Sequence, residues 1–119
     1  MKKITFTLVL FFAVTAMFAQ NNRHWGTYYG GTNTDQGYSV AHDALGNIYF
    51  AGYTSDTTSS VFSMSGFQNS YGGGTNDAFL VKFNSAGNRL WATYYGGTGT
   101  DQGYALATDA AGNVYLGGQ

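Results

Sequence analysis

Six aspartates are the only side chains in this sequence that could supply a carboxylate for acid–base or metal chemistry, because it contains no glutamate. Four of them recur in pairs 66 residues apart: Asp35 with Asp101, and Asp43 with Asp109. A catalytic group is needed once per active site, whereas a turn-forming group recurs with every turn. We therefore expect Asp43 and Asp109 to cap hairpin turns, and Asp35 and Asp101 to bind backbone N–H groups of the loops that follow Gly-Gly pairs.

The sequence offers few residues that could bind a metal ion or act as a nucleophile. Calcium takes six to eight oxygens, of which Thr34, Asp35 and nearby carbonyls supply only some, without the alternating acidic ligands of an EF-hand loop. His24 and His42 have no repeat partner and lie outside any HExxH spacing, so we expect surface or strand-facing histidines. The absence of cysteine excludes thiol nucleophiles and cysteine-bound zinc. We predict no catalytic, cofactor-binding or metal-binding residues.

Aromatic residues recur at fixed positions. Trp25 and Trp91, with the tyrosine pairs at 28–29 and 94–95, could stack on sugars. Their recurrence at the same strand position favours packing between repeats instead, where large rings bury much apolar area.

Glycine-rich stretches at 30–31 and 72–74 lack the following Lys-Ser/Thr pair of a phosphate loop, and we interpret them as turns. The segment 54–75 is polar, serine-rich and long for a hairpin connection. Because long loops commonly carry binding functions, we expect the recognition surface there, without assigning any single residue.

Charge limits the class of partner. Charged residues make up 9% of the chain and aromatic residues 18%, which is not the composition of a disordered chain. Beyond residue 19, three cations (Arg23, Lys82 and Arg89) stand against the six aspartates, for a net charge of −3. Nucleic-acid binding needs a clustered positive field, so we exclude it.

The first 19 residues have the pattern of a secretory signal peptide. Lys2 and Lys3 precede an uncharged, mostly apolar run over 4–18. That run is shorter than the roughly 20 residues that span a bilayer. We predict cleavage after Ala19, a secreted or cell-surface location, and no membrane contact after cleavage.

The sequence after the predicted signal peptide contains a duplication. Aligning 25–52 with 91–118 gives 19 identities in 28 positions. Within one 66-residue period there are four segments with strand-like patterning, and short Asx-x-x-Gly-Asn turns join them in two pairs. In the first period these segments are 38–43, 47–53, 78–83 and 89–95.

Four short antiparallel strands per repeat fit one blade, the four-stranded sheet of a β-propeller. Three motifs also support this: Trp-x-Thr-Tyr-Tyr-Gly-Gly at 25–31 and 91–97, Ala-x-Asp-x-x-Gly-Asn-x-Tyr-x-x-Gly at 41–52 and 107–118, and Asp-Ala-Phe-Leu-Val-Lys at 77–82. Together they resemble the bacterial β-propeller repeat family called SBBP, and the leader resembles signal peptides of the Bacteroidetes type. The resemblance implies a propeller; a small β-sandwich is the alternative fold.

We expect an all-β, incomplete propeller of about one and a half blades, the N-terminal fragment of a larger ring. Its predicted parts are a signal peptide (1–19), an N-terminal closing strand at 25–29 with its linker (20–36), a first blade (37–101) and a truncated second blade (102–119). Strand edges left open would favour self-association.

The predicted function is a non-enzymatic, secreted or cell-surface propeller segment that serves as a scaffold or binds an extracellular protein or carbohydrate. The alternative is a fragment of a propeller enzyme of the lactonase or glycosidase type, whose active site lies in other blades.

Overall fold

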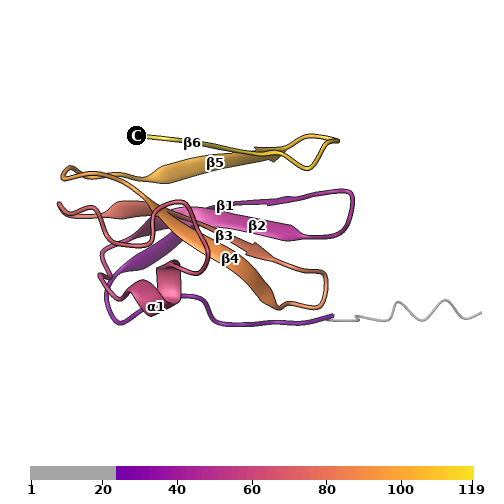
Figure 1. Ribbon diagram of the computed structural model, residues 1–119, viewed down its shortest axis with the longest axis horizontal. Coiled ribbons are helices and arrows are strands. Elements are labelled where there is room, and N and C mark those ends of the chain that lie inside the picture. The colour runs from indigo at the N-terminus through magenta and orange to yellow at the C-terminus, as the bar shows by residue number, and fades with distance from the viewer. Residues whose placement is uncertain (1–23) are drawn as a thin grey trace, which may run out of the picture.

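A computed structural model describes residues 24–119, so the predicted signal peptide lies outside the described residues. The described part is all-β, as predicted, with six strands and one short helix (Figure 1). The elements are β1 (Asp35–His42), β2 (Ile48–Thr54), α1 (Ser59–Phe62), β3 (Asp77–Phe83), β4 (Arg89–Tyr95), β5 (Gly103–Thr108) and β6 (Val114–Gly118).

The strands form two antiparallel sheets. One has four strands in the order β1-β2-β3-β4, and the other is the β5-β6 hairpin. The hairpin lies against one side of the four-stranded sheet, mainly over β1 and β2, while α1 and the N-terminal segment lie on the opposite side (Figure 1). The four-stranded sheet is the antiparallel meander expected of one blade.

The sequence duplication is also a structural duplication. Strand β1 pairs with β2 through Val40 opposite Phe50, and β5 pairs with β6 through Leu106 opposite Leu116, each exactly one period later in the chain. Both hairpins contain a bulge at the same place, between Gly37 and Ser39 in the first and one period later in the second. The second hairpin therefore repeats the inner half of the first blade.

The Asx-Gly turns form as predicted. Asp43 Oδ1 accepts hydrogen bonds from the backbone N–H groups of Leu45 and Asn47, both at 3.0 Å. Gly46 then adopts a φ of 78°, a left-handed conformation that costs a residue with a Cβ about 1–2 kcal/mol. Asp109 and Gly112 repeat this turn between β5 and β6.

The core occupies both sides of the four-stranded sheet, because the central strand β3 is buried on both of its faces. On the α1 side, Phe79, Val81 and Phe83 of β3 pack with Phe62, Ala92 and Tyr94. On the opposite side, Leu80 packs with Tyr49 and Ala51. We call this second side the hairpin face, since it faces β5 and β6.

Residues 24–34 form no strand, so the strand predicted at 25–29 is not formed. This segment is held by side chains rather than by backbone pairing: the Trp25 ring centroid lies 5.8 Å from that of Phe83, and the Tyr29 ring lies against Phe62 and Phe79. A strand requires a neighbouring strand for its hydrogen bonds, whereas an aromatic side chain needs only an apolar surface.

Much of the segment 54–75 is structural, which its polar composition did not predict. Phe62 of α1 is fully buried in the core. Beyond it, Met64 pairs with Ala92 and Gln68 pairs with Tyr94, so the chain covers the outer edge of β4. This covering protects the blade from edge-to-edge association.

Candidate binding site between the repeats

The two sheets stack through apolar side chains. Leu106, Val114 and Leu116 of the second repeat pack against the cluster around Leu80, with Trp91 beside them. Two hydrogen bonds join the innermost strands of the two sheets: Leu106 N–H to Ser39 Oγ at 3.0 Å, and Thr108 Oγ1 to the carbonyl oxygen of His42 at 2.7 Å. The interface is therefore apolar in its centre and fixed in register at its inner rim.

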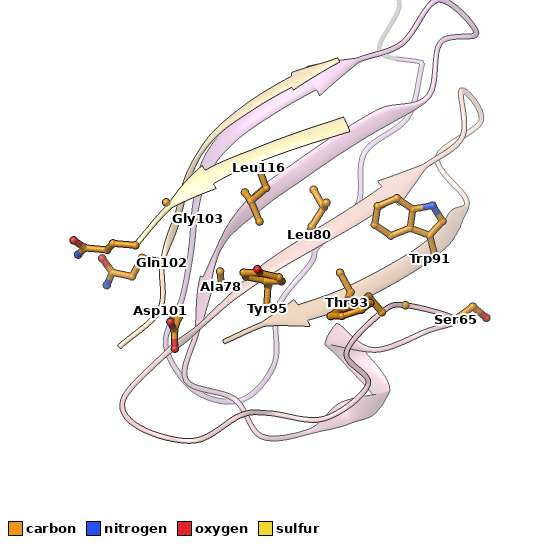
Figure 2. Close-up of a pocket in the computed structure, with 14 residues that line it drawn as sticks. Ser65, Ala78, Leu80, Trp91, Thr93, Tyr95, Asp101, Gln102, Gly103 and Leu116 are labelled. Carbon is orange, nitrogen blue, oxygen red and sulfur yellow. The ribbon is translucent and has the colours of Figure 1, made fainter. Parts of the chain in front are cut away.

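A pocket of about 760 Å³ opens where the β5-β6 hairpin leaves the hairpin face uncovered. Its floor is the outer half of that face, with Leu80, Trp91 and Tyr95, and its opposite wall includes Leu116 of β6 (Figure 2). Residues 65–67 and 101–103 close two further sides. The lining is mainly apolar, and its exposed rings suit binding of another apolar surface.

The first repeat shows what fills the corresponding place. Tyr29 is the counterpart of Tyr95, one period earlier in the chain. The Tyr29 ring is surrounded by Phe62, Phe79 and Phe83, with ring centroids 5.3 to 5.8 Å away. Tyr95 remains 61% exposed beside the pocket. The pocket thus occupies the position that β3 and α1 side chains fill in the first repeat.

The turn before β2 carries an ion pair whose carboxylate is buried and whose lysine is partly exposed. Lys82 Nζ lies 3.8 Å from Asp43 Oδ2 and 5.0 Å from the centroid of the Tyr49 ring. Hydrogen bonds from Asn47 lower the pKa of Asp43 to about 2. In the second repeat, hydrogen bonds from Asn113 likewise lower the pKa of Asp109.

The carboxylates predicted to serve as scaffold do so. Gly31 N–H donates to Asp35 Oδ2 at 2.7 Å, and Gly97 N–H donates to Asp101 Oδ2 at 2.9 Å. Each carboxylate therefore closes the loop that follows a Tyr-Tyr-Gly-Gly segment, as expected.

Two further aspartates are fully buried, and the repeat comparison gave no signal for either, because neither has a counterpart one period away. Hydrogen bonds from Thr58 and Thr32 lower the pKa of Asp56. Burial raises the pKa of Asp77, whose Oδ2 accepts from Gly72 N–H at 2.6 Å while Oδ1 has no partner. Both anchor loops at the ends of strands.

The remaining candidate residues are the two histidines and the recurring aromatic residues. His24 and His42 are exposed, and residues 24–119 contain no group of three or more acidic or histidine side chains placed to hold a metal ion. Of the recurring aromatics, Trp91 packs between the repeats as predicted. Trp25, Tyr29 and Tyr94 pack instead in the core on the α1 side, and Tyr95 is exposed. Tyr28 is fully exposed, because no described residue covers that side of the N-terminal segment.

Comparison with known families agrees with this architecture. The family model for the β-propeller repeat called SBBP matches residues 24–57 and 90–119, more than half of the chain. The chain belongs to the SBBP family. The two SBBP matches begin one residue before the two tryptophans and run through the two duplicated hairpins, and the family indicates a scaffold or binding module.

No curated protein matches the chain significantly. Among residues 24–119, no helix is long and apolar enough to cross a membrane.

Proposed function

We propose that this chain is a non-enzymatic, secreted or cell-surface SBBP module that acts as a scaffold and binds an extracellular protein or carbohydrate through the surface between its repeats. The observation that carries the proposal is the stacking of two sheets with the same internal register. Apolar side chains join them, and an apolar pocket lies beside the joint. Repeats that bury their faces against one another build extended surfaces suited to binding.

Support for secretion comes from the sequence alone. Lys2 and Lys3, followed by the uncharged and mostly apolar run over 4–18, have the pattern of a signal peptide. Expression of the full chain in a Gram-negative bacterium tests this point: intact-mass measurement of the exported product should give a chain that begins at Gln20. Recovery of only full-length protein from the cytosol would contradict secretion.

The scaffold role is tested at the stacking interface. Leu106→Asp places a charge between the sheets, whereas Tyr115→Asp places one on the outward side of the same hairpin. We expect the first variant to release β5 and β6 from the first sheet, seen as loss of amide protection over 103–118, and the second to leave the stacking intact. Equal behaviour of the two variants would contradict a scaffold built by face-to-face stacking.

The non-enzymatic assignment is tested with lactone and nitrophenyl-glycoside substrates. We expect no turnover above buffer by the full chain. Turnover that Trp91→Ala or Tyr95→Ala abolishes would instead place an active site in the pocket and overturn the assignment.

A further inference from the structure

We propose that the carboxylates of Asp77 and Asp101 form a calcium site together with backbone carbonyl oxygens of the loop between β4 and β5. Asp77 begins β3, and Asp101 lies in that loop, two residues before β5. The proposal goes beyond the proposed function and does not depend on it. It departs from the sequence-based expectation of no metal-binding residue, because that expectation took no account of the burial of Asp77.

Asp77 is a buried carboxylate with one oxygen atom left unpaired. The residue is 0% exposed. Its Oδ2 accepts hydrogen bonds from Gly72 N–H at 2.6 Å and from Gln68 Nε2 at 3.4 Å, whereas its Oδ1 has no partner among residues 24–119. Buried charges in proteins are paired with an opposite charge or bound to a metal ion. The unpaired oxygen therefore points to a ligand from solution.

This unpaired oxygen lies beside the carboxylate of Asp101. A Cβ on Gly96 would lie 2.8 Å from Asp77 Oδ1 and 3.0 Å from Asp101 Oδ2, so both oxygens lie on the same side of Gly96. Burial raises the pKa of Asp77, and the nearby charge of Asp101 adds to the rise. A proton shared between the two carboxylates would neutralise one negative charge, whereas a divalent cation neutralises both.

No lysine or arginine side chain in residues 24–119 supplies the missing positive charge. Lys82 Nζ lies 3.8 Å from Asp43 Oδ2. Arg89 donates instead to the carbonyl oxygens of Val61 and Ser60. Because Lys82 and Arg89 are the two residues of these types in the described range, the carboxylate pair requires a cation from solution.

The loop between β4 and β5 adds oxygen atoms of the kind that calcium binds. The carbonyl oxygens of Gly96 and Gly97 lie against Gly72, the residue that donates to Asp77 Oδ2. No heavy atom beyond the adjacent residues lies within 4 Å of a Cβ on Gly97 or Gly99, so this exposed loop has room to adjust around an ion. Calcium takes six to eight oxygens from carboxylates, carbonyls and water in a flexible geometry, whereas magnesium demands a near-ideal octahedron. The loop therefore favours calcium.

The corresponding loop of the first repeat has no unpaired carboxylate oxygen. There Asp35, the counterpart of Asp101, and the buried Asp56 hold the loop at 30–34, and all four of their carboxylate oxygens accept hydrogen bonds. The donors are Thr54 Oγ1 and the backbone N–H groups of Gly31, Thr32 and Thr58. The first repeat thus satisfies its carboxylates with protein donors and provides a matched control.

Titration of the metal-free, full mature chain with calcium, followed by NMR, tests the site. We expect saturable shifts of the Gly72, Gly96 and Gly97 amides, with a dissociation constant of about 10⁻⁴–10⁻³ M, the range of extracellular calcium modules. Asp77→Asn and Asp101→Asn keep an oxygen for the loop N–H groups but remove a charge, so each should weaken binding at least about tenfold. The control Asp35→Asn should change the affinity less than about twofold.

Three results would overturn the proposal: no saturable shift of these amides up to about 10 mM calcium, an affinity that Asp77→Asn leaves unchanged, or equal weakening by Asp35→Asn and Asp101→Asn. A carboxyl carbon shift that marks Asp77 as protonated at pH 7 with and without calcium would also overturn it, by assigning a proton in place of the ion. None of these results would disturb the stacking measured with Leu106→Asp, so failure of this inference remains distinct from failure of the proposed function.

Discussion

Tyr49 and Tyr115 occupy the same position of the duplicated motif, yet Tyr49 is buried and Tyr115 is exposed. Both donate to the aspartate that caps the preceding turn, with nearly equal distances. Tyr49 is covered by β3 and by the neighbouring hairpin, whereas Tyr115 lies on the outward side of β6. Local sequence therefore determines the hairpin, and neighbouring elements determine how much that hairpin contributes to stability.

The largest expected difference between the repeats comes from these tyrosines. Tyr49→Ala removes a large buried side chain and should cost about 3–5 kcal/mol in the free energy of unfolding. Tyr115→Ala removes an exposed one and should cost less than about 1 kcal/mol. Urea denaturation followed by tryptophan fluorescence measures both. Equal losses would show that the two hairpins are equally buried in solution.

Glycines at the bulges give a second matched pair. A Cβ on Gly52 or on Gly118 would overlap the carbonyl oxygen of Gln36 or of Gln102, respectively. Strand β2 is paired on both sides, so Gly52→Ala should cost about 1–3 kcal/mol. Among residues 24–119, strand β6 is paired on one side only and can shift, so Gly118→Ala should cost less. Thermal unfolding ranks the two variants, and a larger effect at Gly118 would contradict the assignment of β6 as the freer strand.

The turn glycines test whether a hairpin contributes to the global stability of the chain or only to its own local stability. Gly46 and Gly112 have φ values of 78° and 83°, so alanine at either should cost about 1–2 kcal/mol. We expect Gly46→Ala to lower the global unfolding free energy. Gly112→Ala should mainly speed amide exchange in β5 and β6. Hydrogen exchange compared with urea denaturation separates the two effects; a purely global effect of Gly112→Ala would contradict this.

The smallest effect is expected from pH. The folded-state pKa of Asp43 lies below its ordinary value, so its contribution to stability is complete above about pH 4 and is lost as the pH falls towards 2. Asp43→Asn should flatten the dependence of the unfolding midpoint on pH in that window. Asp109→Asn should leave the midpoint nearly unchanged, because its hairpin contributes less to global unfolding. Melting curves between pH 2 and 6 test the pair.

The sequence predicted what depends on local pattern. The bounds of β4 agree with the segment predicted over 89–95, and the turn at Asp43 agrees with its Asx-x-x-Gly spacing. Packing of Trp25 and Trp91 against the apolar core followed from their recurrence, but recurrence did not predict that Tyr29 is packed while its counterpart Tyr95 is exposed.

Tertiary context decided the rest. Phe62 lies in a serine-rich stretch, and the polar composition of that stretch gave no sign that Phe62 is buried in the core. Asp77 has no repeat partner, so its burial depends on loops that pattern analysis could not place. The pocket is equally invisible in the sequence, because it is defined by which parts of a face remain uncovered after the sheets stack.

Native-state hydrogen exchange of the full chain, resolved residue by residue by NMR, tests the central claim that the second repeat is a blade half that depends on the first. The account predicts the slowest exchange in β3, which is paired on both sides, and fast exchange for those β6 amides that point away from β5. Protection of these β6 amides equal to that of β3 in the isolated monomer would contradict it.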